Sequence, residues 1–391
     1  MNIAFFCIPA HGHTNPTLAV VRELTARGHT VRYYTTEAFR AKVEAAGAVF
    51  VPFDAEAARP GMTAADGARL GSDLAFSTKL IVDLTLAADD WLSRELTAHR
   101  PDVIVGDSMA FWAKLAAKKH GIPFVSSTTT FAFNRFSAKV IGQNGAGFLQ
   151  FLLAQPRINR QLKRLRAAGY AVKSVFDIIA NDNETETVVY TSPDFQPCAD
   201  TFSEKYHFVG PLLRPAQSSF EKLPGRSLIY ISLGTVNNDA LPFYRACLAA
   251  FGGDPRFQLV LSAGTQTDLA ALGPIPESCT VRASVDQMAV LDCADVFLTH
   301  CGMNSASEGL WHGLPLVLYP QTPEQHGVAN RVAALGAGVP LTDPSADGIR
   351  RAVETALTDP SYRENAQKLA GSFRRCGGAA EAADAIEHAA N

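Results

Sequence analysis

The sequence predicts an α/β protein of two domains, each built on a parallel β-sheet. In both halves of the chain, short apolar runs typical of buried strands alternate with helical segments, and a stretch rich in proline, serine and other polar residues separates the two series. A chain of 391 residues also exceeds what one hydrophobic core usually serves. We expect a first domain at residues 1–209, a linker at 210–226, a second domain at 227–375, and a final helix within 376–391 that could dock back on the first domain.

The first half opens with a continuous apolar run at residues 3–8, as expected for a strand buried on both faces. Asn15 then fits the cap of a helix whose first position is Pro16. Two strand–helix–strand units within about fifty residues indicate a parallel sheet. Further strands are expected at 31–35, 49–53, 103–106 and 123–126, and helices at 37–46, 80–99 and 109–119.

Between residues 131 and 176 the alternation loosens, and phenylalanines lie among small and polar residues. Such an insertion suits the wall of an apolar ligand site, but the same rings could simply pack a helical hairpin, and the pattern leaves both interpretations open. The second series then follows. Its strands are expected at 227–233, 258–262, 280–283, 296–299 and 314–320, with a helix near 241–251 and a final helix at 379–390.

Composition and charge narrow the class of protein. With 47% hydrophobic and 19% charged residues, the chain is typical of a globular protein, and a net charge of −3 without a basic stripe argues against a nucleic-acid partner. Seven scattered cysteines with no Cys-x-x-Cys pair argue against a disulfide framework or a zinc cluster and favour a cytoplasmic location. We expect no signal peptide and no stable membrane insertion, because no basic n-region and no bilayer-length apolar segment occurs.

The most informative stretch follows the strand at 296–299. There His300, Gly302, Asn304 and Ser305 lead into a helix, whose first amide groups have no partner within the helix and therefore attract an anion. Glu308 lies about one turn further on, where a carboxylate would accept hydroxyl hydrogen bonds from a ribose. The pattern therefore predicts a nucleotide site, although an ordinary capped helix with a solvated glutamate would give the same residues.

Two further segments fit the same site. Gly234 and Thr235 follow a strand and offer an amide and a hydroxyl to a phosphate, and the Glu324–Gln325 pair repeats a polar signal after the next strand. No Asp-x-Asp occurs to hold a divalent ion, so no metal is expected to be required. Helix dipole, amide groups and His300 would then meet the charge of the phosphates.

The turn after the first strand reads AHGHTNP and lacks G-x-G-x-x-G, which argues against a nicotinamide dinucleotide. It places His13 at the carboxyl end of a sheet strand, where α/β proteins bind ligands and where an imidazole can act as a general base. Asp107, at the end of another strand, is the candidate that would orient it. The alternatives are that His13 caps the next helix and that Asp107 caps the helix at 109–119.

These motifs resemble those of nucleotide-sugar-dependent glycosyltransferases of the GT-B type, specifically family 1, with bacterial macrolide glycosyltransferases closest. The resemblance covers nearly the whole chain and is most specific at HGHTNP and at H-x-G-x-N-S-x-x-E followed by P-Q-x-x-E-Q. It implies two Rossmann-like domains whose parallel sheets face a central cleft, with acceptor on the first and donor on the second. By position it implies that the base is His13, its acidic partner Asp107, the pyrophosphate ligands His300, Asn304 and Ser305, the ribose ligands Glu308 and Gln287, and the sugar ligands Glu324 and Gln325.

One departure from the family pattern concerns the nucleobase. Members often carry W-x-P-Q, whose Trp stacks on uracil, where this chain has Ser284, Val285, Asp286 and Gln287. Loss of that ring would remove roughly 1 to 3 kcal/mol of stacking. Backbone groups near Val285 could still pair with a pyrimidine edge, and the choice between UDP- and TDP-sugars stays open.

The resemblance implies an inverting transfer of a hexose, with glucose from UDP-glucose as the first expectation, to a hydroxyl of an apolar small molecule such as a macrolide, flavonoid or other polyphenol. The nucleotide sugar would be a co-substrate, with no permanently bound cofactor. The residues expected to bind the acceptor are Phe76, Met109, Phe131, Phe133, Phe136 and Phe148. A sugar-nucleotide 2-epimerase of similar architecture and a non-catalytic nucleotide-sugar-binding protein are the alternatives.

Overall fold

The computed structural model describes residues 1–53, 73–137, 147–181, 183–235 and 238–391, with the backbone alone for residues 147–153. The chain divides into two compact units. Unit 1 comprises Met1–Tyr190, Cys198–Leu212 and Gly377–Asn391, whereas unit 2 comprises Thr191–Pro197 and Leu213–Cys376. The last residues of the chain therefore return to unit 1.

Unit 1 contains a seven-stranded sheet within the described residues, and all of its neighbouring strands are parallel. This confirms the predicted α/β class for the first half of the chain. In spatial order the strands are β3 (Val49–Pro52), β2 (Thr30–Thr35), β1 (Asn2–Phe6), β4 (Val103–Asp107), β5 (Phe124–Thr128), β6 (Thr187–Val189) and β7 (Tyr206–Phe208).

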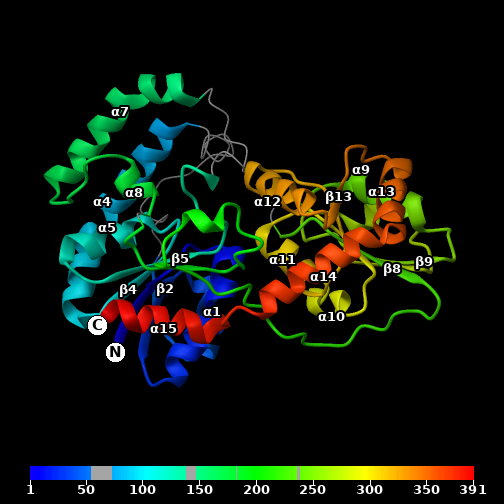
Figure 1. Cartoon of the computed structure of the whole chain (residues 1–391), viewed down its shortest axis with the longest axis horizontal. Coiled ribbons are helices and arrows are strands. Elements are labelled where there is room, and N and C mark those ends of the chain that lie inside the picture. Colours follow the sequence, from blue (N-terminus) through cyan, green and yellow to red (C-terminus); the bar gives the residue numbers. More distant parts are fainter. Residues whose placement is uncertain (54–72, 138–146, 182, 236–237) are drawn as a thin grey trace. The chain divides into compact units, whose positions relative to one another are not determined.

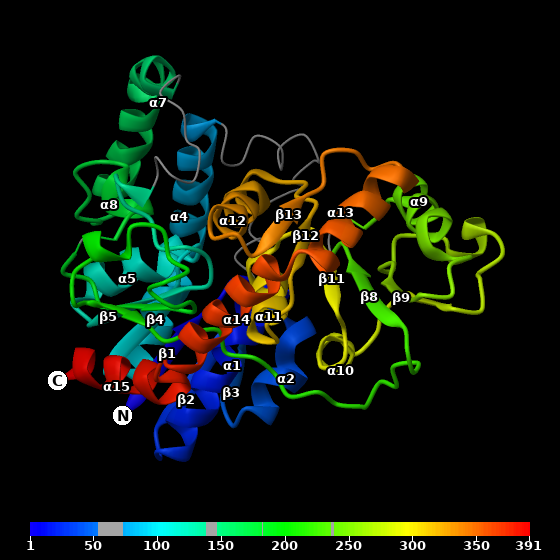
Figure 2. The same ribbon diagram turned by 45° about the vertical axis from the view of Figure 1, so that its right-hand side comes forward.

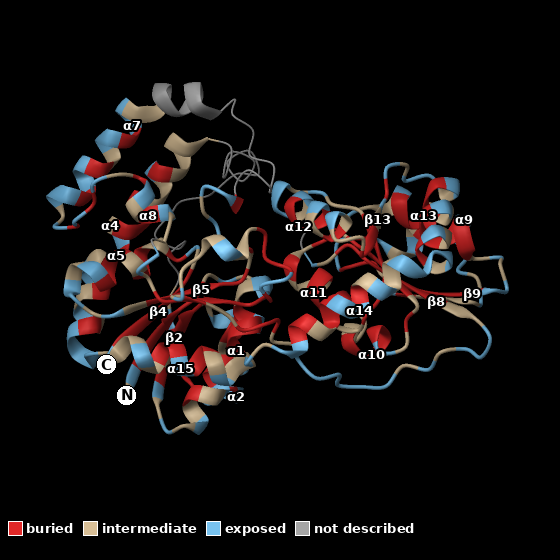
Figure 3. Cartoon of the chain, viewed as in Figure 1, coloured by how far each residue is buried: buried red, intermediate tan, exposed pale blue. Residues whose placement is uncertain are grey.

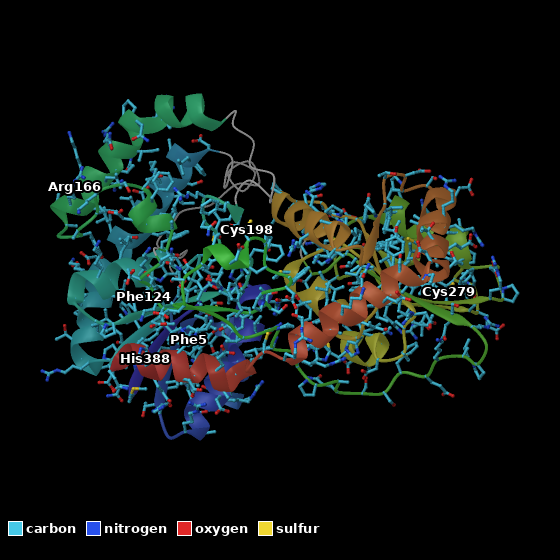
Figure 4. The ribbon with its side chains drawn as sticks, viewed as in Figure 1. Phe5, Phe124, Arg166, Cys198, Cys279 and His388 are labelled. Carbon is cyan, nitrogen blue, oxygen red and sulfur yellow. The ribbon has the colours of Figure 1, made fainter. Side chains whose placement is uncertain are left out.

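Helices cover both faces of this sheet (Figure 1). The described helices of unit 1 are α1 (His11–Ala26), η1 (Glu37–Phe39), α2 (Arg40–Ala45), α4 (Leu74–His99), α5 (Phe111–His120), α7 (Gly147–Ala167), α8 (Phe176–Ile179), η2 (Ala199–Thr201) and α15 (Gly378–Ala390). Successive residues of β1 face opposite layers. Phe5, labelled in Figure 4, belongs to the core with α1 and α15, and Phe6 to the core with α4 and α5. A strand covered on both sides reads as an unbroken apolar run, which is why β1 could be predicted.

Helix α15 is held on unit 1 by ion pairs as well as by apolar packing. The guanidinium of Arg27 lies 2.6 Å from Asp384, and Nε2 of His29 lies 2.6 Å from Glu387. The amide of Gly378, at the start of the helix, donates to the carbonyl of Val209. The last helix is thus an integral part of the layer that also contains α1.

Unit 2 contains a six-stranded parallel sheet within the described residues. In spatial order its strands are β10 (Cys279–Arg282), β9 (Phe257–Ser262), β8 (Ser227–Ser232), β11 (Val296–Thr299), β12 (Leu316–Leu318) and β13 (Gly338–Pro340). The strands are largely buried, as the red ribbons of Figure 3 show. The second half therefore also has the predicted class.

The helices of unit 2 form layers on both faces of its sheet (Figure 2). They are α9 (Leu241–Phe251), η3 (Leu269–Leu272), α10 (Gln287–Leu291), α11 (Met303–Trp311), α12 (Pro323–Ala334), α13 (Ala346–Thr358) and α14 (Pro360–Arg374). Helices α9 and α13 share one core with the sheet. Gly309 lets α11 lie close to the other face, because a Cβ there would approach Phe297 and Leu316 to 2.9 Å.

The first helix begins earlier than the sequence predicts. Asn15 is not its cap, since α1 starts at His11 after Ala10, and Pro16 lies inside the helix. Because Pro16 has no N–H, it cannot donate the helical hydrogen bond to the carbonyl of Gly12, four residues before it. Thr14, in the extra turn, is buried, and so are Pro16, Thr17 and Leu18 beyond it. Since the helix starts at His11, His13 is a helical residue and not part of a loop.

Candidate active site

His13 and Asp107 meet at the carboxyl edge of the unit 1 sheet. Nδ1 of His13 lies 2.7 Å from Oδ2 of Asp107, although 94 residues separate them in the chain. Asp107 ends β4 and its side chain is fully buried, whereas the side chain of His13 is 18% exposed. The other carboxylate oxygen of Asp107 accepts a hydrogen bond from the amide of Met109 at 2.8 Å. The carboxylate therefore orients the histidine and also braces the turn that follows β4.

The contact with Asp107 decides the tautomer of a neutral His13. An ionised carboxylate only accepts hydrogen bonds, so Nδ1 carries the proton and its N–H donates a hydrogen bond to Asp107. The lone pair is then on Nε2, the nitrogen that would take a proton from a substrate hydroxyl. Neither residue behaves as the simple helix cap considered above, because the cap position of α1 has no side-chain hydrogen bond and α5 starts only at Phe111.

Thr129 is a further member of this cluster that the sequence analysis missed. Its Oγ1 lies 3.0 Å from Nδ1 of His13, and the residue is buried just beyond the end of β5. Strand β5 pairs with β4 in parallel, with Asp107 opposite Ser127. The polar run after the strand at 123–126 was the available signal, because carboxyl ends of neighbouring parallel strands share one sheet edge.

In unit 2, His300 follows β11 and packs between the main chains of Gly234 and Gly302. A Cβ added to either glycine would lie 2.6 Å from Nε2 of His300, so only residues without a side chain allow the imidazole this position. Gly234 has a φ of +80°, which also favours glycine. Asn304 and Ser305 lie in the first turn of α11, directly beyond this ring. The residues predicted to hold a diphosphate are thus gathered at one edge of the unit 2 sheet.

Burial lowers the pKa of His300 to about 4, a shift that the main chain of Ser232 only partly opposes. His300 is therefore a neutral hydrogen-bond donor near pH 7 and not a fixed cation. The protein avoids burying a charge, and the positive potential for a phosphate comes mainly from the amides at the start of α11.

This shift predicts a pH dependence of stability. Between the ordinary histidine pKa of 6.5 and the folded value, the unfolded chain binds a proton that the folded chain does not, so acidification destabilises the fold. From pH 7 to pH 4.5 the wild type should lose about 2 kcal/mol more than His300→Gln, which has no titrating group there. Urea unfolding of both proteins at each pH measures this difference. Equal losses in the two proteins would show that His300 is not held neutral by burial.

Glu308 and Gln287, both predicted to bind the ribose, contact each other directly. The side-chain amide of Gln287 donates to Oε2 of Glu308, and its Oε1 accepts a hydrogen bond from the hydroxyl of Tyr230 at 2.9 Å. Burial raises the pKa of Glu308, while Gln287 and then the charge of Arg214 act in the opposite direction. The carboxylate is therefore oriented by Gln287 and partly desolvated.

The linker contributes to the same region, which the sequence analysis did not anticipate. Oδ2 of Asp286 accepts hydrogen bonds from the amides of Gln217 and Ser218 at 2.6 and 2.9 Å. Burial raises the pKa of Asp286, but the hydrogen bonds from Gln217 and Ser218 and, more weakly, the charge of the exposed Arg214 bring it below its ordinary value. The charge of Arg214 also opposes the rise in the pKa of Glu308. Val285, the residue expected at the nucleobase, precedes Asp286 in the chain and is half-buried. Arg214, which falls in the predicted linker, is thus close to the position expected for the nucleoside.

Glu324 and Gln325 lie in the first turn of α12. Oε1 of Gln325 accepts from the amides of Gln321 and Thr322, while Oγ1 of Thr322 accepts from the amide of Gln325, so the two residues form a capping box. The oxygen of Gln325 is therefore committed to the helix end, which leaves its NH₂ group as the part suited to a sugar hydroxyl. Glu324 is exposed at the same turn.

The structure separates the candidates for binding an apolar acceptor. Met109, Phe133 and Phe136 are 49%, 46% and 41% exposed, which is unusual for large apolar side chains. Phe131 is buried and belongs to the interior of unit 1, and Phe76 is half-buried in the first turn of α4. The side chain of Phe148 lies outside the described residues.

No group of three or more His, Cys, Asp or Glu side chains among the described residues is arranged to hold a metal ion. In the same part of the chain, we find no helix with the length and apolar character needed to cross a bilayer.

Comparisons with known proteins identify the family of this chain. The model of a family described as UDP-glucoronosyl and UDP-glucosyl transferase matches residues 271–374. NDP-glycosyltransferase YjiC of Bacillus licheniformis is 33% identical over 99% of this chain and 97% of its own. Demethyllactenocin mycarosyltransferase of Streptomyces fradiae is also 33% identical, over 99% of this chain and 86% of its own.

Among solved structures, the glycotransferase of kitacinnamycin superposes with a TM-score of 0.85 at 31% identity and covers 99% of this chain and 98% of its own. Similarity of this extent, along the whole chain and in both sequence and fold, establishes membership. The chain belongs to the family-1 glycosyltransferases of the GT-B type and is a UDP-glycosyltransferase.

Proposed function

We propose that the protein transfers a hexose, with glucose from UDP-glucose as the leading donor, to a hydroxyl of an apolar small molecule with inversion at the anomeric carbon. The observation that carries this proposal is the 2.7 Å contact between His13 and the buried Asp107, because it gives the chain a general base with a fixed tautomer. Exposed apolar side chains of unit 1 at Met109, Phe133 and Phe136 support an oily acceptor such as a macrolide or polyphenol.

In this mechanism the acceptor oxygen attacks the anomeric carbon while the bond from that carbon to the diphosphate oxygen breaks. Nε2 of His13 takes the hydroxyl proton, and Asp107 stabilises the imidazolium that forms. His300 and the amides at the start of α11 stabilise the charge that develops on the departing diphosphate. A single displacement inverts the anomeric centre. We further propose that the reaction needs no divalent metal and takes place in the cytoplasm, where seven free cysteines would stay reduced.

Release of nucleoside diphosphate tests the proposal. Incubation with UDP-glucose, other UDP-sugars and TDP-sugars should liberate UDP or TDP only when a phenolic or macrolide acceptor is present, and chelation of divalent ions should leave the rate unchanged. Chromatography measures the nucleotide, and NMR of the glycoside gives the anomeric configuration. Retention of configuration would contradict the single displacement.

The same assay separates the two alternatives. A sugar-nucleotide 2-epimerase would convert the donor without any acceptor. A non-catalytic binding protein would bind UDP yet release none from a UDP-sugar. The paired His13 and Asp107 favour the transferase over a protein that has lost its base.

A further inference from the structure

Gly234, two residues after β8, makes hydrogen bonds through both its amide and its carbonyl. The amide of Gly234 donates to Oγ of Ser232 at 3.3 Å, and its carbonyl accepts from Nδ2 of Asn238 at 3.0 Å. The imidazole of His300 packs against the Cα of the same glycine. The amide, the carbonyl and the Cα of Gly234 are therefore each in contact with a different residue.

Asn238 is itself anchored and almost completely buried, with 1% of its surface exposed. Its Oδ1 accepts from the amide of Gln266 at 3.2 Å, and its carbonyl accepts from Oγ1 of Thr267 at 2.5 Å. A Cβ at Gly264, where φ is +74°, would lie 2.0 Å from the Asn238 side chain. Asn238 thus joins the loops that follow two neighbouring strands, β8 and β9.

The bond from Asn238 to Gly234 determines where the next amide points. In a trans peptide the carbonyl of one residue and the N–H of the following residue point in opposite directions. Because Asn238 fixes the carbonyl of Gly234, it also fixes the amide of Thr235 on the opposite side of that peptide. Thr235 is exposed, and its amide points away from the buried side chain of Asn238.

We propose that Asn238 is a positioning residue for the diphosphate of the donor, and this proposal rests on the function proposed above. Asn238 does not touch the ligand in this role. It holds the peptide between Gly234 and Thr235 in the orientation that offers an amide to a phosphate oxygen, next to the imidazole of His300. A preoriented amide binds an anion without the cost of ordering a glycine-containing loop.

A matched pair of variants tests this role. Asn365 makes the same kind of hydrogen bond near the amino end of β13. Its Nδ2 donates at 3.2 Å to the carbonyl of Gly336, a glycine with φ of +64° that precedes this strand. Asn238→Ala and Asn365→Ala therefore each remove a hydrogen bond from an asparagine Nδ2 to a glycine carbonyl in unit 2. Titration calorimetry gives the Kd for UDP and TDP, and saturation-transfer NMR competition gives the affinity for uridine, which has no phosphate.

We expect the Kd for UDP to rise about tenfold in Asn238→Ala and to stay unchanged in Asn365→Ala, because one hydrogen bond of this kind contributes roughly that factor. Affinity for uridine should stay the same in both variants, since the nucleoside contacts of Glu308 and Gln287 are intact. If Asn238→Ala does not fold, as judged by its thermal midpoint, Asn238→Ser replaces it with a shorter polar side chain.

Three results would overturn the proposal. Wild-type affinity for UDP in a folded Asn238 variant would show that the loop needs no such support. Equal weakening in the Asn238 and Asn365 variants, or equal loss of UDP and uridine, would assign the effect to general loosening of unit 2. A wild-type protein that binds neither UDP nor TDP would instead refute the proposed function itself.

Discussion

Replacement of His13 by alanine should lower the turnover number by about 10² to 10⁴ while the Kd for UDP stays nearly constant. The reason is that the expected base and the expected nucleotide site belong to different units. His13 and its partner Asp107 belong to unit 1, whereas the residues proposed to bind the nucleotide, among them His300 and Glu308, belong to unit 2. The loss should be greatest with an unactivated aliphatic alcohol, whose hydroxyl is hardly ionised near pH 7 and depends most on a base.

His11 provides the matched control, since it is a histidine in the same first turn of α1. Its ring packs edge-on to Phe39 with centroids 5.1 Å apart, and the residue is exposed. His11→Ala should keep the wild-type turnover number. Initial rates with a saturating donor and a series of acceptors measure both variants. Full activity of His13→Ala toward the aliphatic alcohol would remove His13 from the role of base.

The strands that could be predicted from sequence are those covered on both faces. Residues 3–8, 227–233 and 296–299 read as apolar runs because helices pack on each side of β1, β8 and β11, and all three are strands in the structure. The strands β6 and β13 span three residues each, too few for a periodic signal to emerge. A short strand forms because neighbouring strands pair with it, and its own residues give no sign of that pairing.

The residues of the candidate site also differ in how far local sequence could predict them. His13 and Asp107 could be proposed as partners because both follow apolar strands, yet Thr129 was missed, since its place depends on β5 lying beside β4. Local sequence also misplaced the start of α1. Asn15–Pro16 is a strong helix-start signal, but the helix begins one turn earlier, at His11, in a turn that buries Thr14. In each case tertiary contacts decided between local alternatives.

Gly302→Ala should lower kcat/KM for the UDP-sugar by about 10², although Gly302 has no side chain that could contact a ligand. Its φ of −59° is accessible to alanine, so the backbone need not change. The added Cβ would lie 2.6 Å from Nε2 of His300, and the ring cannot withdraw toward the main chain of Gly234 on its other side. The imidazole must therefore rotate or shift, which moves its N–H away from the phosphate.

A double-mutant cycle decides whether the effect passes through the imidazole. In a His300→Ala background, the ring is absent and Gly302→Ala should cost almost nothing further in kcat/KM. Gly253→Ala is the control for an added methyl group, because a Cβ there meets no atom within 4 Å. Additive losses in the double variant would mean that Gly302 acts independently of the His300 ring, through the helix cap or a direct approach of the ligand.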